Sequence, residues 1–180
     1  MADRVSPTHL SVLQRICRRL AGEPILWSLT GSLGLALQGV PVAVHDIDLQ
    51  TDAAGAYAIE RCFAGEVTRP VAYLPSERIR SHLGALEIDG IKVEIMGDME
   101  HRLPSGEWKP APDLAALRRF LAVEGLAVPV LPLAFEQQAY LELGRTEKAE
   151  LIRQAIEDQA FPPSASPGNT SSCRIGTWTK

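Results

Sequence analysis

Long apolar runs, cysteine and excess positive charge are all scarce in this sequence. No stretch approaches the roughly 20 consecutive apolar residues that a membrane-spanning helix needs. Residues 1–20 alternate polar and apolar side chains and lack the continuous apolar segment of a signal peptide. The three cysteines, Cys17, Cys62 and Cys173, lie far apart and show neither metal-ligand nor redox spacing. Scattered thiols are typical of a reducing compartment, so we expect a cytoplasmic protein that does not bind membranes.

The charge balance excludes a general attraction to polyanions. The 18 basic and 22 acidic residues give a net charge of −4, so no global positive field draws the protein to nucleic acid. With 180 residues and 46% hydrophobic content, the chain is long enough for one domain with a small helical appendage. We expect this domain to cover residues 1–160. From residue 162 onward Pro, Ser, Gly and Thr dominate, which predicts a disordered tail over 161–180.

Hydrophobic periodicity predicts helices alternating with strands. The expected helices cover residues 9–20, 33–38, 53–64, 135–143 and 147–159. The expected strands cover residues 25–30, 44–52, 67–74, 85–88 and 91–95, with a further hairpin within 117–130. Residues 97–112 are rich in loop-forming residues and predict a loop. The core of the domain therefore extends over about 9–130, and C-terminal helices follow at about 133–159.

The clearest local signal is Asp89-Gly90, which predicts a two-residue β-hairpin turn. Such a turn fixes the strand register and places Glu87 opposite Lys92 as an oppositely charged pair. On the same face, Glu94 lies two residues further along the strand.

Two aspartates on one strand predict a metal site. Strict alternation over residues 44–52 places Asp46 and Asp48 on one face and His45 on the other. Carboxylates at this spacing offer the hard oxygen ligands that magnesium accepts. A third carboxylate, Glu94, would bind metal or take the proton from an attacking hydroxyl. We interpret His45 as a packed core residue.

A glycine and a serine lie between the first strand and its helix. Gly31 allows backbone to approach a phosphate closely, and the start of a helix binds anions. Ser32 adds a hydroxyl donor, and 13 residues separate it from Asp46.

These residues resemble the nucleotidyltransferase superfamily. Its signature is Gly-Ser or Gly-Gly, about a dozen residues, then Asp-x-Asp, with a later acidic residue on a strand. Here the matching residues are Gly31, Ser32, Asp46, Asp48 and Glu94. The surrounding residues look most like the small stand-alone members, which include aminoglycoside and lincosamide adenylyltransferases. The likeness extends over roughly residues 9–158.

The resemblance implies a fold, a cofactor and a substrate. The fold would be α+β (α/β mixed), with a mixed, mostly antiparallel sheet flanked by helices and followed by C-terminal helices. Mg²⁺ or Mn²⁺ would be held by the three carboxylates, which would also be the catalytic residues. A nucleoside triphosphate, ATP in the first instance, would be the substrate, and the acceptor would be a small molecule or a protein.

The chain departs from many small members at two places. Those members carry a lysine and an aspartate in their last two helices where this chain has Tyr140 and Lys148. Three functions stay open on these residues. The first is a metal-dependent transferase that moves a nucleoside monophosphate to an acceptor hydroxyl and releases pyrophosphate. The second is a non-catalytic nucleotide-binding or protein-interaction module, such as one half of a toxin–antitoxin pair. The third is a phosphohydrolase that uses water as the nucleophile.

A basic run at Arg78, Arg80 and His82 is a candidate contact for the triphosphate. Strict hairpin register points Arg80 away from Glu94, whereas a bulge near Gly84 would turn it toward that carboxylate. We retain Arg80 as a nucleotide-binding residue on that condition.

Overall fold

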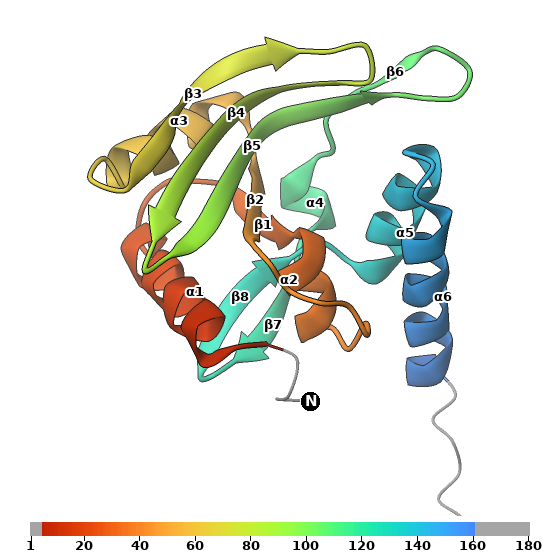
Figure 1. The fold of residues 1–180 in the computed structure, drawn as a ribbon, viewed down its shortest axis with the longest axis horizontal. Helices are drawn as coiled ribbons and strands as arrows, with labels where there is room; N and C mark the ends of the chain where they lie inside the picture. The colour runs from red at the N-terminus through yellow and green to blue at the C-terminus, as the bar shows by residue number, and fades with distance from the viewer. Residues whose placement is uncertain (1–4, 161–180) are drawn as a thin grey trace, which may run out of the picture.

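One mixed sheet organises the chain, and helices cover both of its faces (Figure 1). The computed structural model describes residues 5–160. The helices are α1 (Pro7–Leu20), α2 (Gly31–Leu37), α3 (Ala53–Cys62), α4 (Leu114–Leu117), α5 (Leu133–Glu142) and α6 (Thr146–Ala160). The strands are β1 (Trp27–Thr30), β2 (Ile47–Thr51), β3 (Val67–Pro75), β4 (Ile79–Ile88), β5 (Ile91–Arg102), β6 (Trp108–Lys109), β7 (Arg119–Val123) and β8 (Leu126–Val130).

The strands follow the order β3-β4-β5-β2-β1-β8-β7, and β6 pairs with the far end of β5. The β1–β8 and β2–β5 pairs are parallel, and the remaining pairs are antiparallel. The expected α+β fold with a mixed, mostly antiparallel sheet is therefore confirmed. None of the helices within residues 5–160 is long and apolar enough to cross a membrane.

The two faces of β5 serve different purposes because side chains alternate along a strand. Val93 and Ile95 are fully buried in the main core, together with apolar residues of α1 and α3. Glu94 and Met96 point to the opposite face and line a cavity shared with α5. A second apolar cluster joins α2, α5 and α6. The acidic face of β5 is thus covered by the C-terminal helices.

The Asp89-Gly90 hairpin has the predicted register, with Ala85 opposite Glu94. Both of its strands are longer than expected, and β5 continues through residues 97–102, where we predicted a loop. That expectation was wrong because Glu100, His101 and Arg102 continue the pairing with β4 and β6 beyond Gly97.

In the β4–β5 pairing the β-bulge lies in β5 at Asp98, and the register at Gly84 is regular. The register runs from His82 opposite Gly97 to Arg80 opposite Glu100, so β5 has one residue more than β4 in this interval. Asp98 adopts the left-handed conformation with φ 46°, which is typical of such an inserted residue. The extra residue shifts the alternation of β5, so that its later residues continue to line the face to which Glu94 points.

Other predicted boundaries need smaller corrections. β2 begins at Ile47, so residues 44–46 precede the strand. Gly31 and Ser32 form the first turn of α2 rather than a separate turn before it. The two C-terminal helices are confirmed, and Gly144 between them has φ 74°. The tail predicted over residues 161–180 lies outside the described residues.

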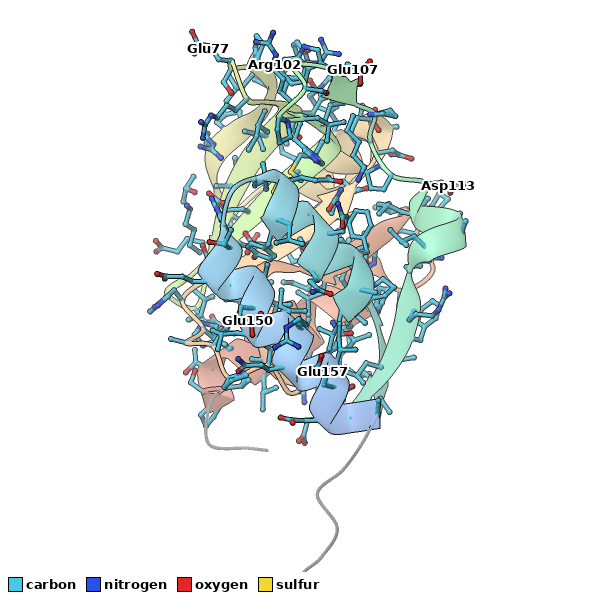
Figure 2. All side chains as sticks on the ribbon, turned by 90° about the vertical axis from the view of Figure 1, so that its right-hand side faces the viewer. Glu77, Arg102, Glu107, Asp113, Glu150 and Glu157 are labelled. Atoms are coloured by element: carbon cyan, nitrogen blue, oxygen red, sulfur yellow. The ribbon has the colours of Figure 1, made fainter. Side chains whose placement is uncertain are left out.

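The outer face of α6 is solvated. Arg153 pairs there with Glu150 and Glu157, and Figure 2 shows both glutamates on the surface of the helix that faces the viewer. Exposed pairs of this kind contribute little stability. The opposite face of α6 buries Ala149 and Ile152 against α5 and α2, which anchors the helix.

Gly97 allows α3 to pack directly on the sheet. A Cβ atom at Gly97 would lie 2.8 Å from the Cβ of Ala56 and 2.8 Å from the carbonyl oxygen of Asp52. We expect Gly97→Ala to lower the free energy of unfolding by about 1–3 kcal/mol, the usual cost of overpacking. Urea denaturation measures this change. Gly65→Ala is the matched control, since a Cβ there meets nothing within 4 Å. Equal stability of the two variants would contradict the packing argument.

Candidate active site

Three neighbouring strands place polar side chains in one row across the sheet. Thr30 at the end of β1 pairs with Asp48 on β2, and Asp48 pairs in turn with Glu94 on β5. Residues directly opposite each other on paired strands have side chains about 5 Å apart. Asp48 is therefore held between Thr30 and Glu94 by backbone register alone.

Asp46 joins this row from the segment just before β2. One carboxylate oxygen from each of Asp46, Asp48 and Glu94 lies within 4.8 Å of the others. Three hard oxygen donors at this separation form a set that a divalent cation such as Mg²⁺ accepts. The structure thus brings together the three carboxylates predicted from the sequence.

Gly31 makes room for the central carboxylate. A Cβ atom at Gly31 would lie only 1.8 Å from Oδ2 of Asp48. Gly31 also has φ 65°, a conformation that favours glycine. We expected this glycine to admit a phosphate close to the backbone, but in the structure the side chain of Asp48 occupies the space beside its Cα.

Glu136 on α5 was missed by the sequence analysis, although it is 4% exposed. Its carboxylate accepts a hydrogen bond from Oγ1 of Thr30 at 2.5 Å and another from the backbone N–H of Gly31. Burial raises the pKa of Glu136 to about 7, while these hydrogen bonds oppose the shift. A glutamate that directly follows the apolar residues Leu133, Ala134 and Phe135 at the start of α5 was the available signal. Glu136 ties α5 to the turn that carries Gly31.

Ser32 has a buried hydroxyl without a hydrogen-bond partner. It lies in the first turn of α2, directly after Gly31. Buried hydroxyl groups are normally hydrogen-bonded, so an orphaned one calls for an explanation such as an absent ligand. Because Gly31, the residue before Ser32, adjoins the carboxylate of Asp48, this hydroxyl belongs to the same turn as the acidic cluster and fits a site for phosphate and metal together.

The electrostatics of the cluster favour a bound cation. Burial, with the charges of Asp46 and Glu94, raises the pKa of Asp48 to about 7. Lys92 donates a hydrogen bond to Glu94 at 2.5 Å. The ion pair of Lys92 is therefore with Glu94 on the same strand, although Glu87 lies opposite Lys92 as expected. A metal ion would relieve the repulsion that Lys92 offsets in part.

A cavity of about 330 Å³ adjoins the cluster. The face of the sheet formed by β2, β4 and β5 makes one wall, and α5 makes the other. At the end remote from the carboxylates, Glu142 of α5 accepts from Lys109 at 2.9 Å and contacts Nε2 of His101 at 2.7 Å. Although burial opposes it, these hydrogen bonds lower the pKa of Glu142 to about 2.

Tyr140 and Lys148, the two residues at which the chain departs from many small members, lie close together in the structure. Nζ of Lys148 lies 5.1 Å from the ring centroid of Tyr140, and Cζ of Arg145 lies 5.9 Å from it. Burial and the charges of Glu136 and Asp48 raise the pKa of the Tyr140 hydroxyl. Positive charge is therefore present beside Tyr140, but it comes from α6 and the turn before it.

Two other sequence expectations are corrected. Arg80 pairs with Glu100 and lies 4.2 Å from the ring centroid of Trp108. It does not line the cavity, because the bulge lies on β5 and leaves the direction of β4 side chains unchanged. His45 is exposed rather than packed in the core, because β2 begins only at Ile47.

Comparison with known proteins agrees with this fold. The structure of a "putative nucleotidyltransferase" from Thermotoga maritima matches with a TM-score of 0.75 and 52% identity, over 86% of this chain and 96% of that one. ANT(2'')-Ia, solved with adenylyl-2''-tobramycin, has 11% identity and a TM-score of 0.54, over 85% and 92% of the two chains. The lincosamide antibiotic adenylyltransferase LnuA, solved with lincomycin, has 12% identity and a TM-score of 0.51, over 83% and 99%. Because their sequence identity is low, the last two matches show similarity of the fold alone.

The fold and the carboxylate cluster are those of a nucleotidyltransferase. The model of the aminoglycoside-2''-adenylyltransferase family matches residues 12–155, so the chain belongs to that enzyme family. No curated protein matched the sequence.

The raised pKa of Asp48 predicts a pH-dependent stability. In the unfolded chain this group ionises near pH 4, whereas in the folded protein it ionises at about 7. Between these values the folded state holds a proton that the unfolded state has lost, so stability falls as pH rises. Asp48→Asn removes the ionisable group, and with it this loss of stability at higher pH.

With EDTA present, we expect the Tm of Asp48→Asn minus the Tm of the unsubstituted protein to become larger as the pH is raised from 5 to 8. Thermal unfolding at several pH values measures this difference. Asp98→Asn is the control, because Asp98 is exposed and lies outside the cluster. Parallel Tm curves for Asp48→Asn and the unsubstituted protein would show that Asp48 ionises normally.

Proposed function

We propose that the protein is a metal-dependent nucleotidyltransferase that moves a nucleoside monophosphate from ATP to an acceptor hydroxyl. The observation that carries this proposal is the cluster of Asp46, Asp48 and Glu94 beside the orphaned hydroxyl of Ser32. Membership in an adenylyltransferase family supports the choice of ATP.

Each residue has a separate task in this proposal. Asp46, Asp48 and Glu94 hold Mg²⁺ or Mn²⁺, which when bound neutralises phosphate charge and polarises the phosphoryl group. Ser32 donates its hydroxyl hydrogen to a phosphate oxygen. Lys148 and Arg145, beside Tyr140, offer positive charge to the pyrophosphate that leaves.

The transfer itself is an in-line displacement at the α-phosphorus. A bond forms between the acceptor oxygen and this phosphorus, and the bond from phosphorus to the bridging oxygen of pyrophosphate breaks. Glu94 accepts the proton of the acceptor hydroxyl, since it lines the cavity from which an acceptor would approach. Lys92 donates a hydrogen bond to Glu94 and holds its side chain in place before the reaction.

Removal of the central carboxylate tests the metal site. We expect Asp48→Asn to lose Mn²⁺ binding, followed by electron paramagnetic resonance, and to weaken MgATP binding in calorimetry by at least about tenfold. Asp98→Asn, the same chemical change on the exposed bulge of β5, is expected to bind both ligands normally.

The result for the unsubstituted protein separates the alternatives. Absence of heat at millimolar MgATP would refute the transferase and favour an interaction module. Release of AMP without any acceptor would favour hydrolysis. Unchanged Mn²⁺ affinity in Asp48→Asn would show that Asp48 is not a ligand of the metal.

The role of Ser32 has an internal control. Ser28 on β1 also has a buried hydroxyl without a partner, but it lies on the strand ahead of the site. A hydrogen bond to a charged group contributes about 1.5–3 kcal/mol, so we expect Ser32→Ala to raise the Kd for MgATP about tenfold or more. Ser28→Ala is expected to leave it unchanged. Equal effects of the two substitutions would show that Ser32 makes no phosphate contact.

A further inference from the structure

We propose that the acceptor is an uncharged, elongated molecule with an apolar body and a terminal hydroxyl group, rather than a polycation. This inference rests on the proposed function and concerns the cavity next to the carboxylate cluster. Its volume of about 330 Å³ is at the lower end of the range for small-molecule sites. One slender ligand therefore fits it.

The walls of the cavity are apolar between its two ends. The sheet and α5 contribute six such side chains, namely Ile79, Leu83, Met96, Met99, Phe135 and Ala139, and Leu143 just after α5 adds another. Methionine fills irregular space and adapts to the shape of a ligand. An apolar body gains free energy by leaving water here, whereas an amine would lose its hydration without a partner.

The charged groups of the cavity are already paired or concentrated at one end. Glu136 is buried and accepts from Thr30 and Gly31, and Glu94 pairs with Lys92. At the other end His101 and Lys109 line the cavity, and both contact Glu142, which lies outside the lining. Asp48 lies at the reacting end with Glu94, and Arg145 beside Tyr140 adds a positive charge that a polycation would meet. A polycation needs several unpaired acidic groups along its length, and the described lining between the two ends offers none.

The β5 bulge sets the length of the cavity. Glu94 and His101 both line it and are seven residues apart on one strand, which corresponds to roughly 20 Å. If β5 alternated regularly through Asp98 with no bulge, Met99 and His101 would turn to the opposite face of the sheet. The bulge thus extends one continuous wall from the reacting end to the contacts of Glu142 with Lys109 and His101. A cavity of this length fits an elongated acceptor.

Three probes test this inference by calorimetry: octyl β-glucoside below its micelle concentration, methyl β-glucoside and tobramycin. The two glucosides share one head group and differ only in the apolar tail. We expect octyl glucoside to bind at least about tenfold more tightly than methyl glucoside, because burial of seven additional methylene groups is favourable. Tobramycin is expected not to bind.

A polar substitution in the wall locates the tail. We expect Met99→Gln, which preserves side-chain length, to weaken octyl glucoside binding about fivefold or more while the Kd for MgATP stays within twofold. Phe120→Gln is the control, since Phe120 on β7 is 62% exposed and lies outside the cavity.

Several results would overturn the inference while leaving the proposed function intact. Tobramycin binding more tightly than octyl glucoside would show a polycation site. Equal affinities for the two glucosides, or no effect of Met99→Gln on the binding of octyl glucoside, would show that the alkyl tail makes no apolar contact with the wall. Weakened MgATP binding in Met99→Gln would assign the cavity to the nucleotide base. Failure of the unsubstituted protein to bind MgATP would instead refute the proposed function.

Discussion

The contact between the carboxylate of Asp48 and the Cα of Gly31 is the constraint on which the site depends. It requires a residue without a side chain at position 31, in a backbone conformation with φ 65°. It also requires β1 and β2 to pair in the register that places Thr30 opposite Asp48. Once this contact is made, the start of α2, the orphaned hydroxyl of Ser32 and the acidic cluster are close together. Local backbone geometry therefore determines the chemistry available at the end of β1.

Two glutamates of α5 connect this region with the C-terminal part of the chain. Glu136 accepts hydrogen bonds from Thr30 and Gly31, and Glu142 contacts His101 and Lys109 at the far end of the β5–β6 arm. The helix is thus held at both ends, and the cavity lies between it and the sheet. Buried carboxylates with several hydrogen bonds position elements strongly, because a broken contact leaves a charge without compensation. The same helix therefore contacts both the turn at Gly31 and the cavity.

Membership in the adenylyltransferase family leaves the residues around the conserved chemistry free to differ. Tyr140 stands where many small members carry a lysine, yet Lys148 and Arg145 bring positive charge to the same ring. A cation can be supplied from either helix because the electrostatic effect depends on position and burial, not on the order of residues. The apolar cavity adjoins Glu94, so its lining affects which molecules can approach this carboxylate.

The sequence by itself determined the features that depend on short-range geometry. Alternation placed Asp46 and Asp48 on one side, and the Asp89-Gly90 turn set Ala85 opposite Glu94, because both rules act over a few residues. Tertiary structure alone decided the rest. The parallel β2–β5 pairing that sets Asp48 beside Glu94, and the approach of Glu136 to Gly31, join segments distant in sequence. The bulge at Asp98 has no strong local signal, so the direction of Met99 and His101 followed only from the completed sheet.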